Sequence, residues 1–185
     1  MVDILTTFAI SIEDFLKKTE KEKQVYKPQM SLLHIDFVRE RGQKYQEFCR
    51  LAKYWTNGPE YMKDRYPYAS SWFIELITAS VFDVCESNLN LVQLFDCFLR
   101  RVRNMKSKKT YMAFSDYYKK EQYREKWKGK LAVIEPTNPN DNLAERGHQV
   151  ENMTELVKRA KDTLKTWEEN NFDEVFQTYF PRQPD

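Results

Sequence analysis

Hydrophobic residues recur every three or four positions through most of this sequence, which is the period of one face of an α-helix. Residues 43–56 show the pattern most clearly and are predicted to form a helix with a buried face and a separate polar stripe. The buried face comprises Tyr45, Phe48, Cys49, Ala52 and Trp55. The polar stripe comprises Gln46, Arg50, Lys53 and Asn57. This helix is therefore expected at the edge of the core, with its stripe facing solvent or a ligand.

The same spacing predicts four further helices, at residues 31–41, 72–84, 89–103 and 153–167. Ser31 can cap the first of these, and Gly42 is a natural stop after it. A charged segment before Ser31 is predicted to be helical or loose and to end near Pro28. The second helix is apolar on nearly every side, so its carboxylate, Glu75, should be hydrogen-bonded or paired if it is buried.

Short strands are predicted in two places. Residues 2–8 are mostly apolar or β-branched, and residues 131–135 are similar and lead into a turn at 136–141. Residues 110–118 are rich in aromatic side chains and fit either a strand or an irregular cover. The expected fold is mainly α: a helical bundle of five or so helices, with short strands at the N-terminal edge and near Leu131.

Composition narrows the classes of protein. The chain has 185 residues, of which 41% are hydrophobic and 31% charged, as expected for one globular domain and not for a disordered chain. The longest apolar run, residues 72–82, is interrupted by Glu75 and is too short to cross a bilayer, so no membrane partner is expected. No signal-peptide pattern occurs, and the three cysteines cannot all pair. A reduced compartment, the cytoplasm or the nucleus, is therefore predicted.

Charge is nearly balanced overall, at +2, but it is unevenly distributed. Residues 100–109 carry six Lys or Arg residues and no acid, and more lysines follow between 119 and 130. Such clusters fit a nucleic acid or another phosphate partner, but charge alone favours a solvated helix end followed by a flexible loop. His34 and His148 are far apart and have no suitable Cys or His neighbours, so a zinc site is not expected.

Several short motifs occur in an order that resembles one known family. They are Asp36-Phe37-Val38-Arg39 followed by Lys44, then Arg50-Leu51-Ala52-Lys53-Tyr54-Trp55, Glu75-Leu76-Ile77-Thr78 and Ile134-Glu135-Pro136-Thr137-Asn138-Pro139. Together they resemble the 2′–5′ oligoadenylate synthetases, from the last part of the nucleotidyltransferase domain through the C-terminal helical domain. Val2-Asp3-Ile4-Leu5 followed by Phe8 is similar to the strand that carries that family's third catalytic carboxylate.

The resemblance implies three groups of site residues. Asp3 matches the third of three carboxylates that hold two Mg²⁺ ions for adenylyl transfer. The residues implied in nucleotide binding are Arg50 and Lys53, at the phosphates, and Ser71 and Trp72, where the family has a glutamine and a base-packing tyrosine. The residues implied to contact the backbone of activating double-stranded RNA are Arg39, Gln43 and Lys44.

The resemblance also implies a domain organisation. Residues 1–28 would be a remnant of the catalytic nucleotidyltransferase domain, 29–181 the C-terminal helical domain that binds substrate and RNA, and 182–185 a tail. The expected function is binding of ATP or a related nucleotide and of double-stranded RNA, with adenylyl transfer only if a partner supplies the catalytic half. The alternatives are a catalytically dead double-stranded RNA-binding module and a protein-interaction scaffold.

The 185-residue polypeptide alone is expected to make no oligoadenylate from ATP and Mg²⁺, with or without double-stranded RNA. The family's Gly-Ser motif and first two metal carboxylates precede the position of Asp3, and the sequence has no Gly-Ser dipeptide. A lone Asp3 cannot hold two ions that each need several oxygen ligands. A product assay checks this prediction, and RNA-dependent product that disappears in Asp3→Asn would contradict it.

Overall fold

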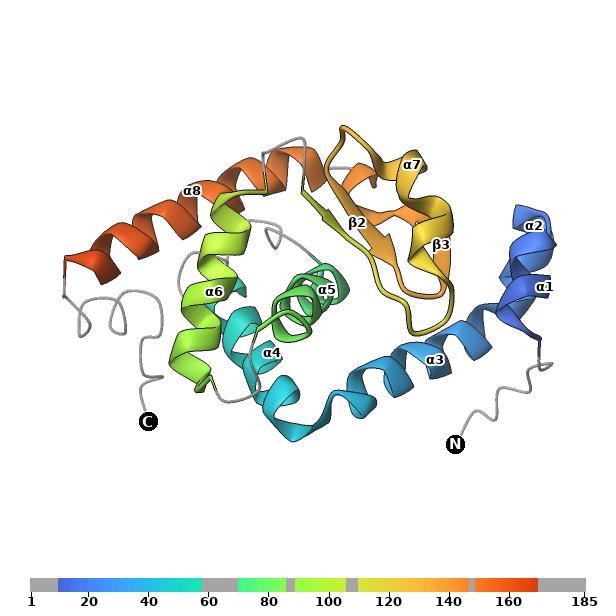
Figure 1. Cartoon of the computed structure of the whole chain (residues 1–185), viewed down its shortest axis with the longest axis horizontal. Coiled ribbons are helices and arrows are strands. Elements are labelled where there is room, and N and C mark those ends of the chain that lie inside the picture. The colour runs from blue at the N-terminus through green and yellow to red at the C-terminus, as the bar shows by residue number, and fades with distance from the viewer. Residues whose placement is uncertain (1–9, 58–69, 86–88, 106–109, 147–148, 170–185) are drawn as a thin grey trace.

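A computed structural model describes residues 10–57, 70–85, 89–105, 110–146 and 149–169 (Figure 1). Within these residues, helices account for most of the chain. The long helices are α3 (Lys27–Glu40), α4 (Gly42–Asn57), α5 (Ser71–Phe82), α6 (Leu91–Arg103) and α8 (Gln149–Glu168). The short ones are α1 (Ile12–Lys17), α2 (Glu20–Lys23) and α7 (Arg124–Trp127). The predicted mainly α fold with about five principal helices is confirmed.

A small sheet covers one side of this helical body (Figure 1). Its strands are β1 (Tyr111–Met112), β2 (Ala132–Glu135) and β3 (Asn138–Asn142), in the order β1-β2-β3. β1 runs parallel to β2, and β2 runs antiparallel to β3. The strand predicted near Leu131 is confirmed as β2, whereas the strand predicted at 2–8 lies outside the described residues.

The turn predicted at residues 136–141 is shorter in the structure than predicted. Only Pro136 and Thr137 form the turn, and the chain then continues into β3. The Asn142 side chain explains the difference, because its Oδ1 accepts hydrogen bonds from the backbone N–H groups of Val133 (2.9 Å) and Ala144 (3.1 Å). The Asn142 side chain therefore joins β3 to β2 and also caps the 3₁₀ turn at Leu143–Glu145.

The main core lies between α4, α5, α6 and α8. All five residues predicted to form the buried face of α4 are buried. Trp55 is central: its ring contacts Phe95 and Phe98 of α6, with centroids 6.0 and 5.7 Å away. Its Nε1 also donates to Thr163 Oγ1 of α8 at 3.1 Å. One side chain thus joins three helices, which fixes α4 and leaves Gln46, Arg50 and Lys53 of its polar stripe on the side away from the core.

The helix predicted to begin at Ser31 begins earlier, at Lys27. Pro28 was expected to end the preceding segment, but it lies in the first turn of α3. Proline is tolerated there because the first backbone N–H groups of a helix have no partner within that helix. The predicted stop is confirmed: α3 ends before Gly42, whose φ of +78° lets the chain change direction into α4.

Arg41 fastens this α3–α4 corner to the rest of the domain. Its side chain is only 9% exposed, with the guanidinium carbon 3.7 Å from the centre of the Phe37 ring. Nε and Nη2 donate to the two carboxylate oxygens of Asp83 at 2.9 and 2.7 Å, and Nη1 lies 3.1 Å from Asp116 Oδ1. Asp83 follows α5 and Asp116 follows β1, so one arginine holds three parts of the fold together.

In the part of the chain that the structure describes, no helix combines the length and the apolar character needed to cross a bilayer.

Candidate functional site

A groove of about 390 Å³ runs between α3, α4 and α5. Its lining residues are His34, Ile35, Val38 and Arg39 of α3, Gln46 of α4, and Trp72 and Glu75 of α5. The walls are therefore partly apolar, with polar and charged groups on all three helices. This composition is typical of small-molecule sites, in which a few polar groups orient a ligand against apolar side chains.

The polar stripe of α4 continues from this groove. Gln46 lines the groove, Arg50 follows one turn later, and Lys53 follows after another turn. Arg50 is exposed and Lys53 is half-buried. Residues three or four apart on a helix are neighbours, so the two cations lie close together on one side of α4.

Glu75 of α5 forms an ion pair with Lys53, which confirms the prediction that this carboxylate would have a partner. The backbone beside it is also anchored, because the Tyr45 hydroxyl donates to the Glu75 carbonyl oxygen at 2.8 Å. The pair joins α4 to α5 at the edge of the groove. An anion that approaches Lys53 must therefore share the ammonium group with Glu75 or displace it.

Trp72 lies in the first turn of α5, which begins where Ser70 Oγ accepts the Phe73 N–H at 3.2 Å. Its ring stacks on His34, with centroids 4.4 Å apart, and meets Phe37 edge-on. The sequence left open whether Trp72 belongs to the core or carries a nucleotide base. The side chain packs against the core and also lines the groove, so base packing stays a prediction. Ser71, beside it, is exposed.

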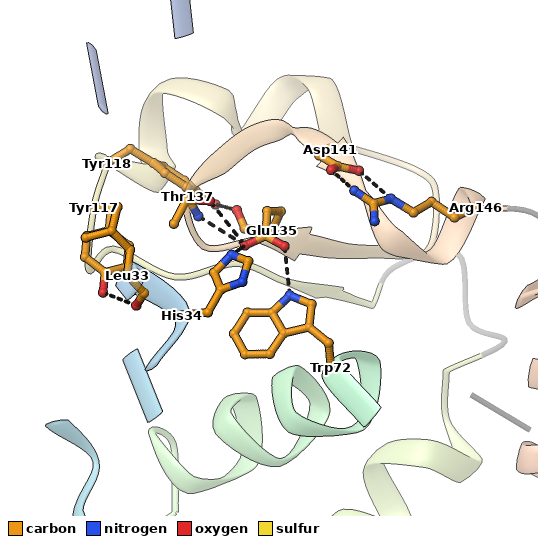
Figure 2. A network of polar contacts seen from close by, with 9 residues as sticks. All are labelled: Leu33, His34, Trp72, Tyr117, Tyr118, Glu135, Thr137, Asp141 and Arg146. Carbon is orange, nitrogen blue, oxygen red and sulfur yellow. Dashed lines mark hydrogen bonds and ion pairs between the residues drawn. The ribbon is translucent and has the colours of Figure 1, made fainter. Parts of the chain in front are cut away.

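A buried carboxylate, Glu135 of β2, sets the position of both stacked rings (Figure 2). Trp72 Nε1 donates to Glu135 Oε2 at 2.8 Å, and His34 Nε2 lies 2.8 Å from Oε1. The Thr137 hydroxyl donates to Oε1 at 3.3 Å. Burial alone would raise the pKa of Glu135, but the contacts with His34, Trp72 and Thr137 outweigh burial and lower that pKa below its usual value.

Sequence reasoning assigned no role to Glu135 or to the His34–Trp72 stack. Glu135 was part of a motif, and His34 was considered only as a zinc ligand. One signal was present: a single carboxylate ends an apolar strand, and a buried carboxylate needs donors. The identity of those donors depends on α3 and α5 meeting β2, which no local pattern specifies.

Glu135→Gln is expected to lower the free energy of unfolding at neutral pH by about 1–3 kcal/mol, because it removes a buried charged acceptor from its donors. The wild-type chain should keep its full advantage in unfolding free energy above about pH 4.5, which is the usual pKa of glutamate, because the pKa of Glu135 in the folded protein is lower than that value. This advantage should shrink as the pH falls from there through the folded pKa. Urea denaturation of both chains between about pH 7 and about pH 3 checks this, and an advantage that stays constant or grows with acid would contradict it.

The residues predicted to contact RNA flank the α3–α4 corner. Arg39 is exposed and pairs with Asp36 at 3.1 Å, and it also lines the groove. Gln43 is exposed, and its Nε2 donates to Glu47 Oε1 at 2.8 Å. Lys44 is half-buried. One of the three predicted RNA contacts is therefore brought next to the predicted nucleotide contacts, which the sequence did not indicate.

Asp3, the predicted metal carboxylate, lies outside the described residues. Among the residues that are described, no three His, Cys, Asp or Glu side chains converge as a cation site. The described part of the chain does not fit a two-Mg²⁺ centre by itself.

Comparison with known proteins identifies relatives. Residues 9–181 match a family model described as 2′-5′-oligoadenylate synthetase 1, domain 2, C-terminus. CdnC of E. coli MS115-1, in a complex with HORMA-deltaN, has the same fold with a TM-score of 0.64 and 22% identity, over 80% of this chain and 50% of that one. The structure of CdnC with ATP has a TM-score of 0.62 and 22% identity, over 81% of this chain and 49% of the CdnC chain. This chain thus spans about half the length of these structures. Among curated proteins no match is found.

Proposed function

This chain belongs to the family of the 2′-5′-oligoadenylate synthetase 1 C-terminal domain, and from that premise we propose that its groove between α3, α4 and α5 binds a nucleoside triphosphate. One observation carries the proposal: Arg50 and Lys53 lie one turn apart on α4, beside a groove that Trp72 lines. Two cations at this spacing suit a chain of phosphates, and an aromatic wall suits a base.

Each residue has a distinct part in the proposed complex. Arg50 is exposed and can approach phosphate oxygens directly, whereas Lys53 must first exchange its Glu75 partner for phosphate. Trp72 and His34 form the wall for the base, held in place by Glu135. CdnC, which shares the fold, has a structure with ATP, and that supports the assignment of a nucleotide to this domain type.

Adenylyl transfer is proposed only for an assembly in which two further metal carboxylates accompany Asp3. Two Mg²⁺ ions would there activate the attacking hydroxyl and stabilise the triphosphate. The residues described here would bind and orient the nucleotide. The partner could be a protein that supplies the catalytic half, and the reduced cytoplasm or nucleus remains the expected compartment.

Titration with ATP and with adenosine tests the proposal. ATP should bind at least about tenfold more tightly than adenosine, because the cations of α4 contact only phosphates. Adenosine that binds as tightly as ATP would contradict the assignment. A chain that binds duplex RNA but not ATP would instead be an RNA-binding module, and a chain that binds neither would fit a protein-interaction scaffold.

A second proposed function, binding of duplex RNA, rests on the corner between α3 and α4. Arg39 lies in the last turn of α3, and Gln43 and Lys44 lie in the first turn of α4. Two cations and an amide at one corner of the fold can contact neighbouring phosphates without reading bases, which is how proteins usually recognise duplex RNA.

Arg39→Ala and Lys44→Ala are each expected to weaken binding of all duplex sequences alike and to lower the salt dependence of log K by about 1. Lys158→Ala, an exposed lysine on α8, is the matched control. A binding series at several salt concentrations measures both effects. Equal weakening by Lys158→Ala would show that attraction is diffuse and that the corner is not a site.

A further inference from the structure

A second pocket, of about 690 Å³, has no part in the functions proposed above. It lies where the ends of α3 and α5 meet α6 and the segment that follows β1, and it shares no lining residue with the groove. Its volume is within the range of roughly 300–1,000 Å³ that is common for small-molecule sites.

Two cations on the pocket wall, Arg101 and Lys120, have no ion-pair partner among the residues that the structure describes. Arg101 lies in the last turn of α6, and Lys120 begins a 3₁₀ turn at Lys120–Tyr123. Both are half-buried, and within the described part of the chain the side chain of neither makes a hydrogen bond or ion pair. Arg41, Asp83 and Asp116 also line the pocket, and there the two carboxylates both pair with the one guanidinium, so Arg41 is not available to a ligand. Partial burial of an unpaired cation is unfavourable, so these two positions favour an anion.

The pocket also has an exposed aromatic wall. Tyr111 of β1 is 39% exposed, with its ring centroid 6.2 Å from that of Trp127. The Arg124 guanidinium lies 6.0 Å from the Tyr111 ring, which adds a third cation beside the pocket. Glu40 lines the pocket as an exposed carboxylate and has no ion pair within the described residues, so it can accept hydrogen bonds from a ligand.

We propose that this pocket binds an aromatic phosphate ester of nucleotide size. The aromatic group packs on Tyr111, the phosphate lies between Arg101 and Lys120, and Glu40 accepts hydrogen bonds from hydroxyl groups of the ligand. A simple polyanion fits less well, because the carboxylates of Glu40, Asp83 and Asp116 also line the pocket and would repel it. A nucleic acid duplex fits less well still, because its phosphates lie on a convex surface and this site is concave. The proposal gives Arg101, from the basic run at 100–109, a specific role.

AMP is a suitable probe, used on the full chain with Arg50→Gln and Lys53→Met so that the groove does not contribute. Arg101→Gln and Lys120→Gln should each raise the dissociation constant for AMP about tenfold, and Tyr111→Ala should raise it by a similar factor. Lys119→Gln, next to Lys120 but outside the pocket lining, should leave it unchanged. The indole N–H resonance of Trp127, which lies against Tyr111, should shift when AMP binds.

Two results would overturn the proposal. One is AMP binding that is absent in the double variant at millimolar concentration, and the other is binding that Lys119→Gln weakens as much as Lys120→Gln does. Neither result tests the proposed nucleotide groove, because the double variant lacks Arg50 and Lys53. The proposal for this pocket can therefore be wrong while the proposal for the groove is right, and the reverse.

Discussion

Replacing Arg41 with methionine is expected to lower the free energy of unfolding by about 2 kcal/mol. Methionine keeps much of the apolar stem against Phe37 but removes every hydrogen bond of the guanidinium. Asp83 and Asp116 then lose their shared cation, and the corner between α3 and α4 loses its attachment to α5 and to the segment after β1. The guanidinium is buried, whereas Asp83 and Asp116 are 38% and 20% exposed, so the expected loss comes mainly from the charge-assisted hydrogen bonds of Arg41.

Urea denaturation monitored by circular dichroism measures this effect. Arg39→Met is the matched control, because Arg39 is a nearby arginine, in the last turn of α3, that also has a carboxylate partner, but its side chain is 71% exposed. Exposed pairs contribute about 0–1 kcal/mol, so the control should change little. Equal destabilisation by the two substitutions, or less than about 1 kcal/mol for Arg41→Met, would show that the Arg41 network does not hold the corner.

Substitutions at the Lys53–Glu75 pair are expected to change ATP affinity in opposite directions. Lys53→Met should weaken binding about 10- to 100-fold, because one charge-assisted contact with phosphate is lost. Glu75→Gln should strengthen binding severalfold, because it removes the carboxylate that competes with phosphate for Lys53. A purely structural ion pair would not behave in this way, since breaking it from either side would impair the same fold.

Calorimetric titration of ATP measures both changes. Lys161→Met, an exposed lysine on α8, controls for the general loss of positive charge. Thermal unfolding of each variant shows whether it remains folded at the temperature of the titration. A weaker affinity in Glu75→Gln, or the same loss in Lys161→Met as in Lys53→Met, would contradict the role assigned to the pair.

The sequence predicted those parts of the fold that depend on local periodicity. The buried face of α4 is correct at every position from Tyr45 to Trp55, because a helix with one apolar face has only one way to meet a core. The end of α3 before Gly42 was also predictable, since glycine permits the backbone conformation required there. The start of α3 could not be predicted, because a proline such as Pro28 can either end one segment or lie in the first turn of the next helix.

The arrangement of the candidate site was predicted only in part. The stripe of Arg50 and Lys53 follows from helical spacing, and the partner of Glu75 could be expected from its burial. The Glu135 network could not be predicted, because it joins residues of α3, α5 and β2 that are far apart in the sequence. The Arg41 network has the same origin: Asp83 and Asp116 reach it from two other segments of the chain.

The most direct test of the central claim is the indole N–H resonance of Trp72 during an ATP titration. This N–H donates to Glu135 at the wall of the groove, so a nucleotide bound there should shift its signal. Trp55, buried on the opposite side of α4, provides an internal reference whose signal should stay fixed. The Trp72 shift should saturate with ATP and disappear in the Arg50→Gln and Lys53→Met double variant. A Trp72 signal that does not move at saturating ATP would contradict the assignment of the groove as the nucleotide site.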